Sequence, residues 1–287
     1  MAVVVLALVV VFVRVVRNVE RTTAPAGPPP AAARQDREAC RDARWRAAAA
    51  ANRASLEALA WTPFGRPEIG WATYAPLIGR EIGSGCAPET EGFAAALARW
   101  QQAHDRLADG VLEPGEFARM NVAMELRRPF VQLTAKGICP AAPPEDQLAA
   151  ARPDESYGRK IVRLRSDALA AYRRMAAAAR AAGVVADPDA FKLISGFRGP
   201  EEEAARCAGG DCNIVTKARC SAHRTGLALD IHLGRGAGSD PVSAAEDNRR
   251  ALSRTRAYRW LVKNADRFGF LNYPYEPWHW EWTGAAP

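Results

Sequence analysis

Apolar side chains recur at helical spacing in the first half of the chain. Across residues 90–104 an apolar residue returns every three or four positions, as on the buried face of a helix. The residues on this face are Phe93, Leu97 and Trp100. After an Asp109-Gly110 turn, Pro114 begins a second helix. The inner face of that helix carries Phe117, Met120 and Met124. Residues 39–139 are therefore predicted to form a small helical domain.

The second half of the chain mixes helical and strand patterns. Residues 156–182 and 244–268 keep apolar side chains at helical spacing. Three segments have the character of strands, namely residues 190–197, 227–233 and 270–282, and a short helix begins at Pro200 after the first of them. This irregular order predicts an α+β fold, with a small antiparallel sheet and flanking helices. It argues against a doubly wound parallel sheet.

Changes in composition mark the predicted boundaries of the domains. Residues 140–155 are rich in Pro and Ala and suit a linker, which separates the helical domain from a second domain at residues 156–287. Residues 18–38 include the run TTAPAGPPPAAA, which suits a tether because it has too few apolar side chains to hold a core.

Residues 1–17, which precede the tether, are almost uniformly apolar. As a helix, Ala2 to Val16 would span about 22 Å, against roughly 30 Å of hydrocarbon in a bilayer. Snorkelling of Arg14 and Arg17, or an upstream start codon, would make the segment long enough for a membrane anchor. A cleaved secretory signal is the alternative, although the basic region at its start is missing. Both interpretations predict an exported protein.

The charge surplus indicates anionic surroundings. The chain has 287 residues, with 39 Lys and Arg against 32 Asp and Glu, and its net charge of +7 gives a pI near 9.3. Nucleic acid, lipid headgroups or an acidic wall polymer would attract such a protein. The basic residues are spread over Ala-rich stretches rather than clustered, so we expect no nucleic-acid partner.

Six cysteines fit an oxidising compartment. They are Cys40, Cys86, Cys139, Cys207, Cys212 and Cys220. None lies in a CxxC pair, so disulfides are favoured over a structural zinc site. Three lie before residue 140 and three after residue 200, so either one disulfide joins the two halves or each half keeps a free thiol. The sequence leaves this pairing open.

Three residues of the second half have the donor chemistry of a catalytic zinc site. His223 precedes Asp230 by seven residues, and the turn at Gly226 lets the two side chains converge. His279 can be the third ligand, because a catalytic zinc takes three protein ligands and leaves the fourth position open. Each histidine alone could instead be a hydrogen-bonded core residue. His232, two residues beyond Asp230 on the same strand face, would be the first replacement ligand.

Peptide hydrolysis also needs a base that takes a proton from water and passes it to the leaving amine. Glu276 and Glu281 flank His279, and strict strand alternation favours Glu281 unless Pro277 bends the chain. The spacing leaves this choice open. Arg198 follows a predicted strand and is placed to bind an oxyanion or a substrate carboxylate, the alternative being a solvated loop residue.

These residues lie in motifs that resemble those of the zinc D-alanyl-D-alanine carboxypeptidases among the LAS metallopeptidases, a group that includes phage peptidoglycan endopeptidases and the hedgehog signalling domain. SGFR at residues 195–198 resembles the S-x-[FY]-R element, and SAHRTGLALD at 221–230 is similar to S-x-H-x-x-G-x-A-x-D. YEPWHW at 275–280 resembles the E-x-W-H element, and WLVKNADRFGF at 260–270 resembles the helix before it.

The resemblance implies a role for each matched residue. It implies zinc bound to His223, Asp230 and His279, with Glu276 rather than Glu281 as the general base. Arg198 would contact the substrate or the transition state. Ser221 and Trp278 lie in the matched motifs and are further candidates for substrate binding. The family usually has a Gln shortly after the Arg, where this chain has acidic residues and a Cys-rich insertion, which leaves substrate preference open.

A second resemblance covers about forty residues of the helical domain. FAAALARWQQAHDRLADGVLEPGEFARM is similar to part of a small peptidoglycan-binding domain, and the alternative is a helical spacer with an ordinary core. The two resemblances together imply a zinc carboxypeptidase that acts on peptidoglycan stem peptides. The N-terminal segment adds the expectation of a membrane tether, and we expect a monomer. The alternatives are an endopeptidase of the same family and a wall-binding protein that holds zinc without turnover.

Overall fold

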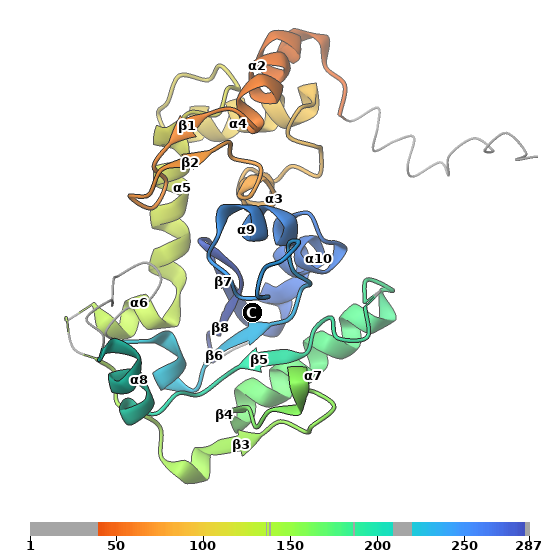
Figure 1. The fold of residues 1–287 in the computed structure, drawn as a ribbon. Coiled ribbons are helices and arrows are strands. Elements are labelled where there is room, and N and C mark those ends of the chain that lie inside the picture. The colour runs from red at the N-terminus through yellow and green to blue at the C-terminus, as the bar shows by residue number, and fades with distance from the viewer. Residues whose placement is uncertain (1–39, 136, 138, 186, 209–219, 285–287) are drawn as a thin grey trace, which may run out of the picture.

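The computed structural model describes residues 40–135, 137, 139–185, 187–208 and 220–284 (Figure 1). The predicted anchor or signal segment, the Pro/Ala tether and Cys212 lie outside these residues. Within them, no helix is both long enough and apolar enough to cross a membrane.

The N-terminal region, residues 40–135, is mainly helical, as predicted. Its elements are η1 (Ala43–Trp45), α2 (Arg46–Leu56), β1 (Ala60–Trp61), β2 (Glu68–Ile69), α3 (Ala75–Glu81), α4 (Glu91–Ala103), α5 (Pro114–Arg127) and α6 (Pro129–Thr134). Helix α4 begins where the hydroxyl of Thr90 accepts the N–H of Phe93. Helix α5 begins at a capping box formed by Glu113 and Glu116. The inner faces predicted for both helices are buried.

The C-terminal region is built on a four-stranded antiparallel sheet. In sheet order its strands are β5 (Leu193–Ser195), β6 (Ala228–Ile231), β8 (Glu276–Trp282) and β7 (Phe270–Tyr273). The helices around it are α7 (Ser166–Ala181), α8 (Pro200–Cys207), α9 (Glu246–Ser253) and α10 (Arg256–Asn264) (Figure 1). This architecture confirms the predicted α+β fold.

The predicted helix over residues 156–182 is wrong in its first ten residues. They contain η3 (Tyr157–Arg159) and β4 (Arg163–Arg165), and β4 pairs with β3 (Leu148–Ala150). Gly158 and Arg159 both have positive φ, which interrupts a helix at that point. Strand β3 and η2 (Glu145–Gln147) also occupy part of the predicted linker, so that segment carries secondary structure of its own.

The predicted helix over residues 244–268 is divided into α9, α10 and η5 (Ala265–Phe268). The break falls at Thr255, whose hydroxyl accepts the N–H of Tyr258 and begins a new helix. Leu252 and Leu261, one on each side of the break, are both fully buried. The apolar spacing therefore continues across the break, which is why the pattern concealed it.

The two regions share one hydrophobic core. It extends from Trp61 and Phe117 in the N-terminal region to Trp280 in the C-terminal region. A buried polar contact crosses the same interface, where Arg249 of α9 forms an ion pair with Glu68 at 2.8 Å. Arg249 also donates to the hydroxyl of Tyr74 at 2.9 Å and is only 2% exposed. The helical region is thus packed firmly against the sheet region.

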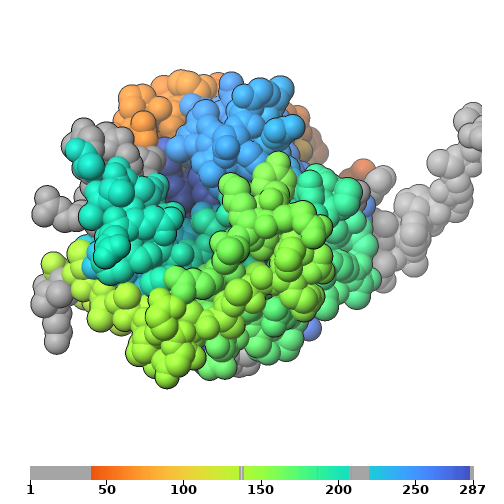
Figure 2. Space-filling model, turned by 60° about the horizontal axis from the view of Figure 1, so that its bottom comes forward, coloured from red at the N-terminus to blue at the C-terminus, as the bar shows by residue number. Residues whose placement is uncertain are grey.

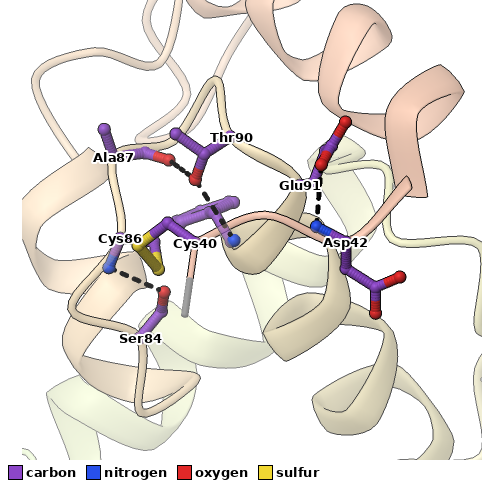
Figure 3. Close-up of a disulfide and its surroundings, with 8 residues drawn as sticks. Cys40, Asp42, Ser84, Cys86, Ala87, Thr90 and Glu91 are labelled. Carbon is purple, nitrogen blue, oxygen red and sulfur yellow. Dashed lines mark hydrogen bonds between the residues drawn. A yellow bond between two sulfur atoms is a disulfide. The ribbon is translucent and has the colours of Figure 1, made fainter. Parts of the chain in front are cut away.

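Two disulfides are present among the described residues. Cys40–Cys86 lies within the N-terminal region, where the N–H of Cys86 also donates to the hydroxyl of Ser84 (Figure 3). Cys139–Cys220 joins the two halves of the chain, which is one of the two arrangements that the odd number of cysteines in each half allows. This second disulfide ties the segment after α6 to the loop that precedes His223.

Candidate active site

Strand pairing brings the predicted metal ligands together. Asp230 of β6 and His279 of β8 are direct partners in the register of the sheet. His223 approaches from η4 (Ala222–Thr225), which ends at Gly226 with a φ of 69°. One ligand atom from each of these three side chains lies within 4.8 Å of the other two, and all three residues are buried.

Hydrogen bonds orient the two imidazole rings. The Nδ1 of His223 lies 2.7 Å from the carbonyl oxygen of Gly196, so this nitrogen carries the proton and donates the hydrogen bond. The other ring nitrogen, Nε2, keeps its lone pair for a metal ion. That Nε2 lies 3.3 Å from Oδ2 of Asp230. The Nδ1 of His279 lies 3.0 Å from Oδ1 of the same carboxylate. The hydroxyl of Ser195 donates to Oδ2 of Asp230 and holds the carboxylate in place.

The charges around these groups favour a cation. Burial lowers the pKa of His223, which keeps that ring neutral. Burial alone would raise the pKa of Asp230, but His223 and His279 hold it well below its usual range. Burial alone would lower the pKa of His279, but Asp230 and Glu281 raise it to about 9. A buried set of two imidazoles and one carboxylate, with the charged Glu281 beside it, fits a divalent metal ion.

The two candidate bases on β8 have opposite surroundings. Glu276 lines the cavity beside the cluster, and burial raises its pKa to about 7. Glu281 is 1% exposed and forms an ion pair with Arg128 at 2.5 Å. Burial alone would raise the pKa of Glu281, but Arg128 and His279 lower it to about 2. Only Glu276 is therefore suited to exchange a proton near neutral pH.

The other predicted site residues divide into two groups. Arg198 lines the cavity and donates from Nη1 to the hydroxyl of Ser221 at 3.0 Å. Trp278 is 3% exposed and packs in the core, because strand alternation turns it away from the side of His279. His232 lies outside the cluster, and its ring stacks on Tyr157 with centroids 4.4 Å apart.

The cluster opens into a cavity of about 300 Å³ with walls from both regions. The C-terminal region contributes the residues Arg198, Ser221, His223, Asp230, Glu276 and His279. The N-terminal region contributes Glu125, Arg128, Phe130 and Val131 around the junction of α5 and α6. In Figure 2 the dark blue C-terminal segment lies recessed between the teal α8 and lighter blue segments. No pattern in the sequence indicated this N-terminal wall, because an arginine between two helices has no distinctive spacing.

Comparison with known families places the C-terminal region. Residues 161–285 match the family model VanY, D-alanyl-D-alanine carboxypeptidase. This segment contains the sheet and the whole His-Asp-His cluster. The match confirms the resemblance that the sequence motifs implied for this part of the chain.

Similarity to individual proteins is more distant. One solved structure, described as that of the LdcB LD-carboxypeptidase and its peptidoglycan recognition, is 23% identical and covers 50% of this chain and 71% of that one. The TM-score is 0.38. A search of curated proteins gave no significant match.

Proposed function

We propose that the protein is a zinc-dependent D-alanyl-D-alanine carboxypeptidase that removes a terminal D-alanine from peptidoglycan stem peptides. One observation carries the proposal: a buried His-Asp-His cluster and the carboxylate of Glu276 line the same cavity in a domain of this family. Zinc is the metal that best suits two imidazoles and one carboxylate with an open fourth position.

The chain's own residues divide the work of hydrolysis. His223 through Nε2, Asp230 through its carboxylate and His279 through Nδ1 would hold the metal. When bound, zinc supplies a Lewis acid that polarises the scissile carbonyl and makes a nearby water more acidic. Glu276, with its pKa near 7, accepts a proton from the attacking water and returns it to the leaving amine.

Arg198 is proposed to bind the substrate's terminal carboxylate. Its hydrogen bond to Ser221 fixes the guanidinium at the cavity wall, and the planar fork can donate two parallel bonds to a carboxylate. Trp278 is not proposed as a substrate contact, because it packs in the core.

The location of the protein is also part of this proposal. A substrate in the cell wall and two disulfides fit an exported protein of the cell envelope. We propose that residues 1–17 anchor or direct the chain and that the N-terminal region contacts the wall polymer, which the surplus of basic residues would favour.

A paired-peptide assay tests the function and separates it from its closest rival. The full chain, loaded with zinc, is given a stem peptide ending in D-alanyl-D-alanine and the same peptide with an amidated end, and products are identified by mass spectrometry. We expect release of D-alanine from the free acid, and we expect Arg198→Lys to lower that rate about tenfold or more. Cleavage inside both peptides at equal rates would identify an endopeptidase, and binding without any product would identify a non-catalytic wall-binding protein.

A further inference from the structure

The N-terminal region reaches the back of the candidate metal site through Arg128. This residue lies between α5 and α6 and is only 5% exposed. Its Nε and Nη2 donate to one oxygen of Glu281, at 2.8 and 2.5 Å, and its Nη1 donates to Glu125 at 2.5 Å. The other oxygen of Glu281 accepts the N–H of Phe130 at 2.9 Å. Both oxygens of this buried carboxylate are therefore fixed by the N-terminal region.

Glu281 in turn faces the ring of His279. Its Oε1, the oxygen that Arg128 holds, lies 3.5 Å from Nε2 of His279. That nitrogen is buried, and among the described residues it has no partner that meets hydrogen-bond geometry. The opposite nitrogen, Nδ1, faces Asp230. The ring thus lies between a carboxylate of the cluster and a carboxylate held from outside it.

We propose that Arg128 is a positioning residue for the metal site. By holding Glu281 against Nε2 of His279, it keeps the proton of the imidazole on that side and directs Nδ1 toward the metal. A carboxylate on the far nitrogen of a ligating histidine fixes the ring and makes it a stronger donor. This inference rests on the proposed metal-dependent function. It means that a residue of the N-terminal region orients a metal ligand of the C-terminal region.

The geometry suits this role because Glu281 needs a partner to keep its place beside His279. A carboxylate buried to this extent loses most of its hydration, so without a partner it would turn toward solvent and away from the ring. Arg128 supplies the charge, and its guanidinium also lies over the ring of Tyr273, 4.1 Å from the centroid. The arginine is therefore held from two sides while it holds Glu281.

Zinc affinity of the full chain, measured by competition with a chelator, tests the proposal without any assay of turnover. We expect Arg128→Met to weaken zinc binding about ten- to a hundredfold, the usual effect of losing a group that orients a metal ligand. Because this variant leaves Glu281 buried without a cation, a second variant, Arg128→Met with Glu281→Gln, removes both charges of this pair and so avoids that cost to stability. In it zinc binding should stay about tenfold or more below that of the unmodified chain, since a neutral amide is a weaker acceptor than a carboxylate.

The chain offers a matched control at the other buried arginine of the interface. Arg249→Met with Glu68→Gln removes a pair that is equally buried and that also joins the two regions, but it does not contact His279. We expect its zinc affinity to stay within about threefold of the unmodified chain. The proposal is wrong if the Arg128 and Glu281 double variant binds zinc as tightly as this control.

Failure of the positioning role can be separated from failure of the proposed function. A chain that binds zinc and cleaves no stem peptide would contradict the carboxypeptidase, while weaker zinc binding in the double variant would still support Arg128 as a positioning residue. A chain that releases D-alanine, with zinc affinity unchanged in the double variant, would contradict only the positioning role.

Discussion

Each of the two regions inserts one buried arginine into the other, and the two arginines differ in whether their partners adjoin the candidate metal site. Arg249 of the C-terminal region enters the N-terminal one and ends at Glu68 and Tyr74, far in sequence from any candidate ligand. Arg128 of the N-terminal region enters the C-terminal one and ends at Glu281, 3.5 Å from His279. A buried arginine–glutamate pair thus supports the packing of the two regions in one place and the candidate metal site in the other.

This difference shows how a helical region can join a catalytic one without contributing a ligand. The described N-terminal residues contribute no member of the His-Asp-His cluster. They contribute a wall of the cavity and the cation that neutralises Glu281. Changes in the two regions should therefore affect different quantities: metal content and turnover for the C-terminal ligands and base, and the free energy of unfolding for most N-terminal residues.

The largest effect is expected from the proposed metal ligands. Asp230→Ala removes the carboxylate that lies between both histidines, so zinc should be lost and turnover with it. Elemental analysis of the purified variant measures this directly. His232→Ala is the matched control, because His232 is a buried histidine two residues further on that stacks on Tyr157, and it should keep one zinc. Unchanged zinc in Asp230→Ala would remove Asp230 from the site.

The next largest effect is expected at the proposed base, Glu276. Glu276→Gln keeps the shape of the side chain but cannot accept a proton, so turnover should fall about a hundredfold or more. Zinc content should be unchanged, because Glu276 is not a member of the cluster. Steady-state rates and elemental analysis of the same sample check both statements. Full activity in this variant would exclude Glu276 as the base.

A smaller and different effect is expected inside the N-terminal region. Asn52 is fully buried, donates to the carbonyl of Gly110 at 2.8 Å and accepts the N–H of Leu112 at 2.9 Å. Asn52→Ala leaves both backbone groups unsatisfied and should lower the free energy of unfolding by about 1–3 kcal/mol. Chemical denaturation measures the loss. Zinc affinity should not change, and a fall of tenfold would show that the N-terminal region acts on the site more widely than through Arg128.

The smallest effect is expected from removing residues 1–33. Because these residues are predicted from the sequence to be a short apolar segment and a Pro/Ala tether, the shortened chain should keep its zinc content and its turnover. Assay of the two forms side by side checks this. A shortened chain that is folded and zinc-loaded but inactive would contradict the interpretation of this segment as a tether.

Local patterns predicted much of the fold. The helices at residues 90–104 and after Pro114 follow from apolar spacing and capping residues close in sequence. The break at Thr255 could not be read in the same way, because the residues on both sides of it pack into the same core. Hydrophobic spacing records which side of a helix is buried and says little about where one helix gives way to the next.

The candidate site was predictable to the extent that its residues lie in short motifs. His223 and Asp230 are separated by a single turn, and His279 faces Asp230 in the sheet register. The choice between Glu276 and Glu281 could not be made from alternation, since it depends on Arg128, which is 153 residues away in sequence from Glu281. Contacts between residues so far apart in sequence leave no periodic pattern in the chain. The contact between Arg128 and Glu281 therefore became visible only in the structure.

The disulfide Cys139–Cys220 also determines what proteolysis would do to this protein. Residues 144–147, between the two regions, are exposed and rich in charge, so a protease could reach them. A cut there would separate the backbone of α5 and α6 from that of the sheet, yet the disulfide would still link the two fragments and the shared core would hold them together. The nicked protein would migrate as one species until a reductant was added, and Arg128 would stay beside Glu281 after the chain between them had been cleaved.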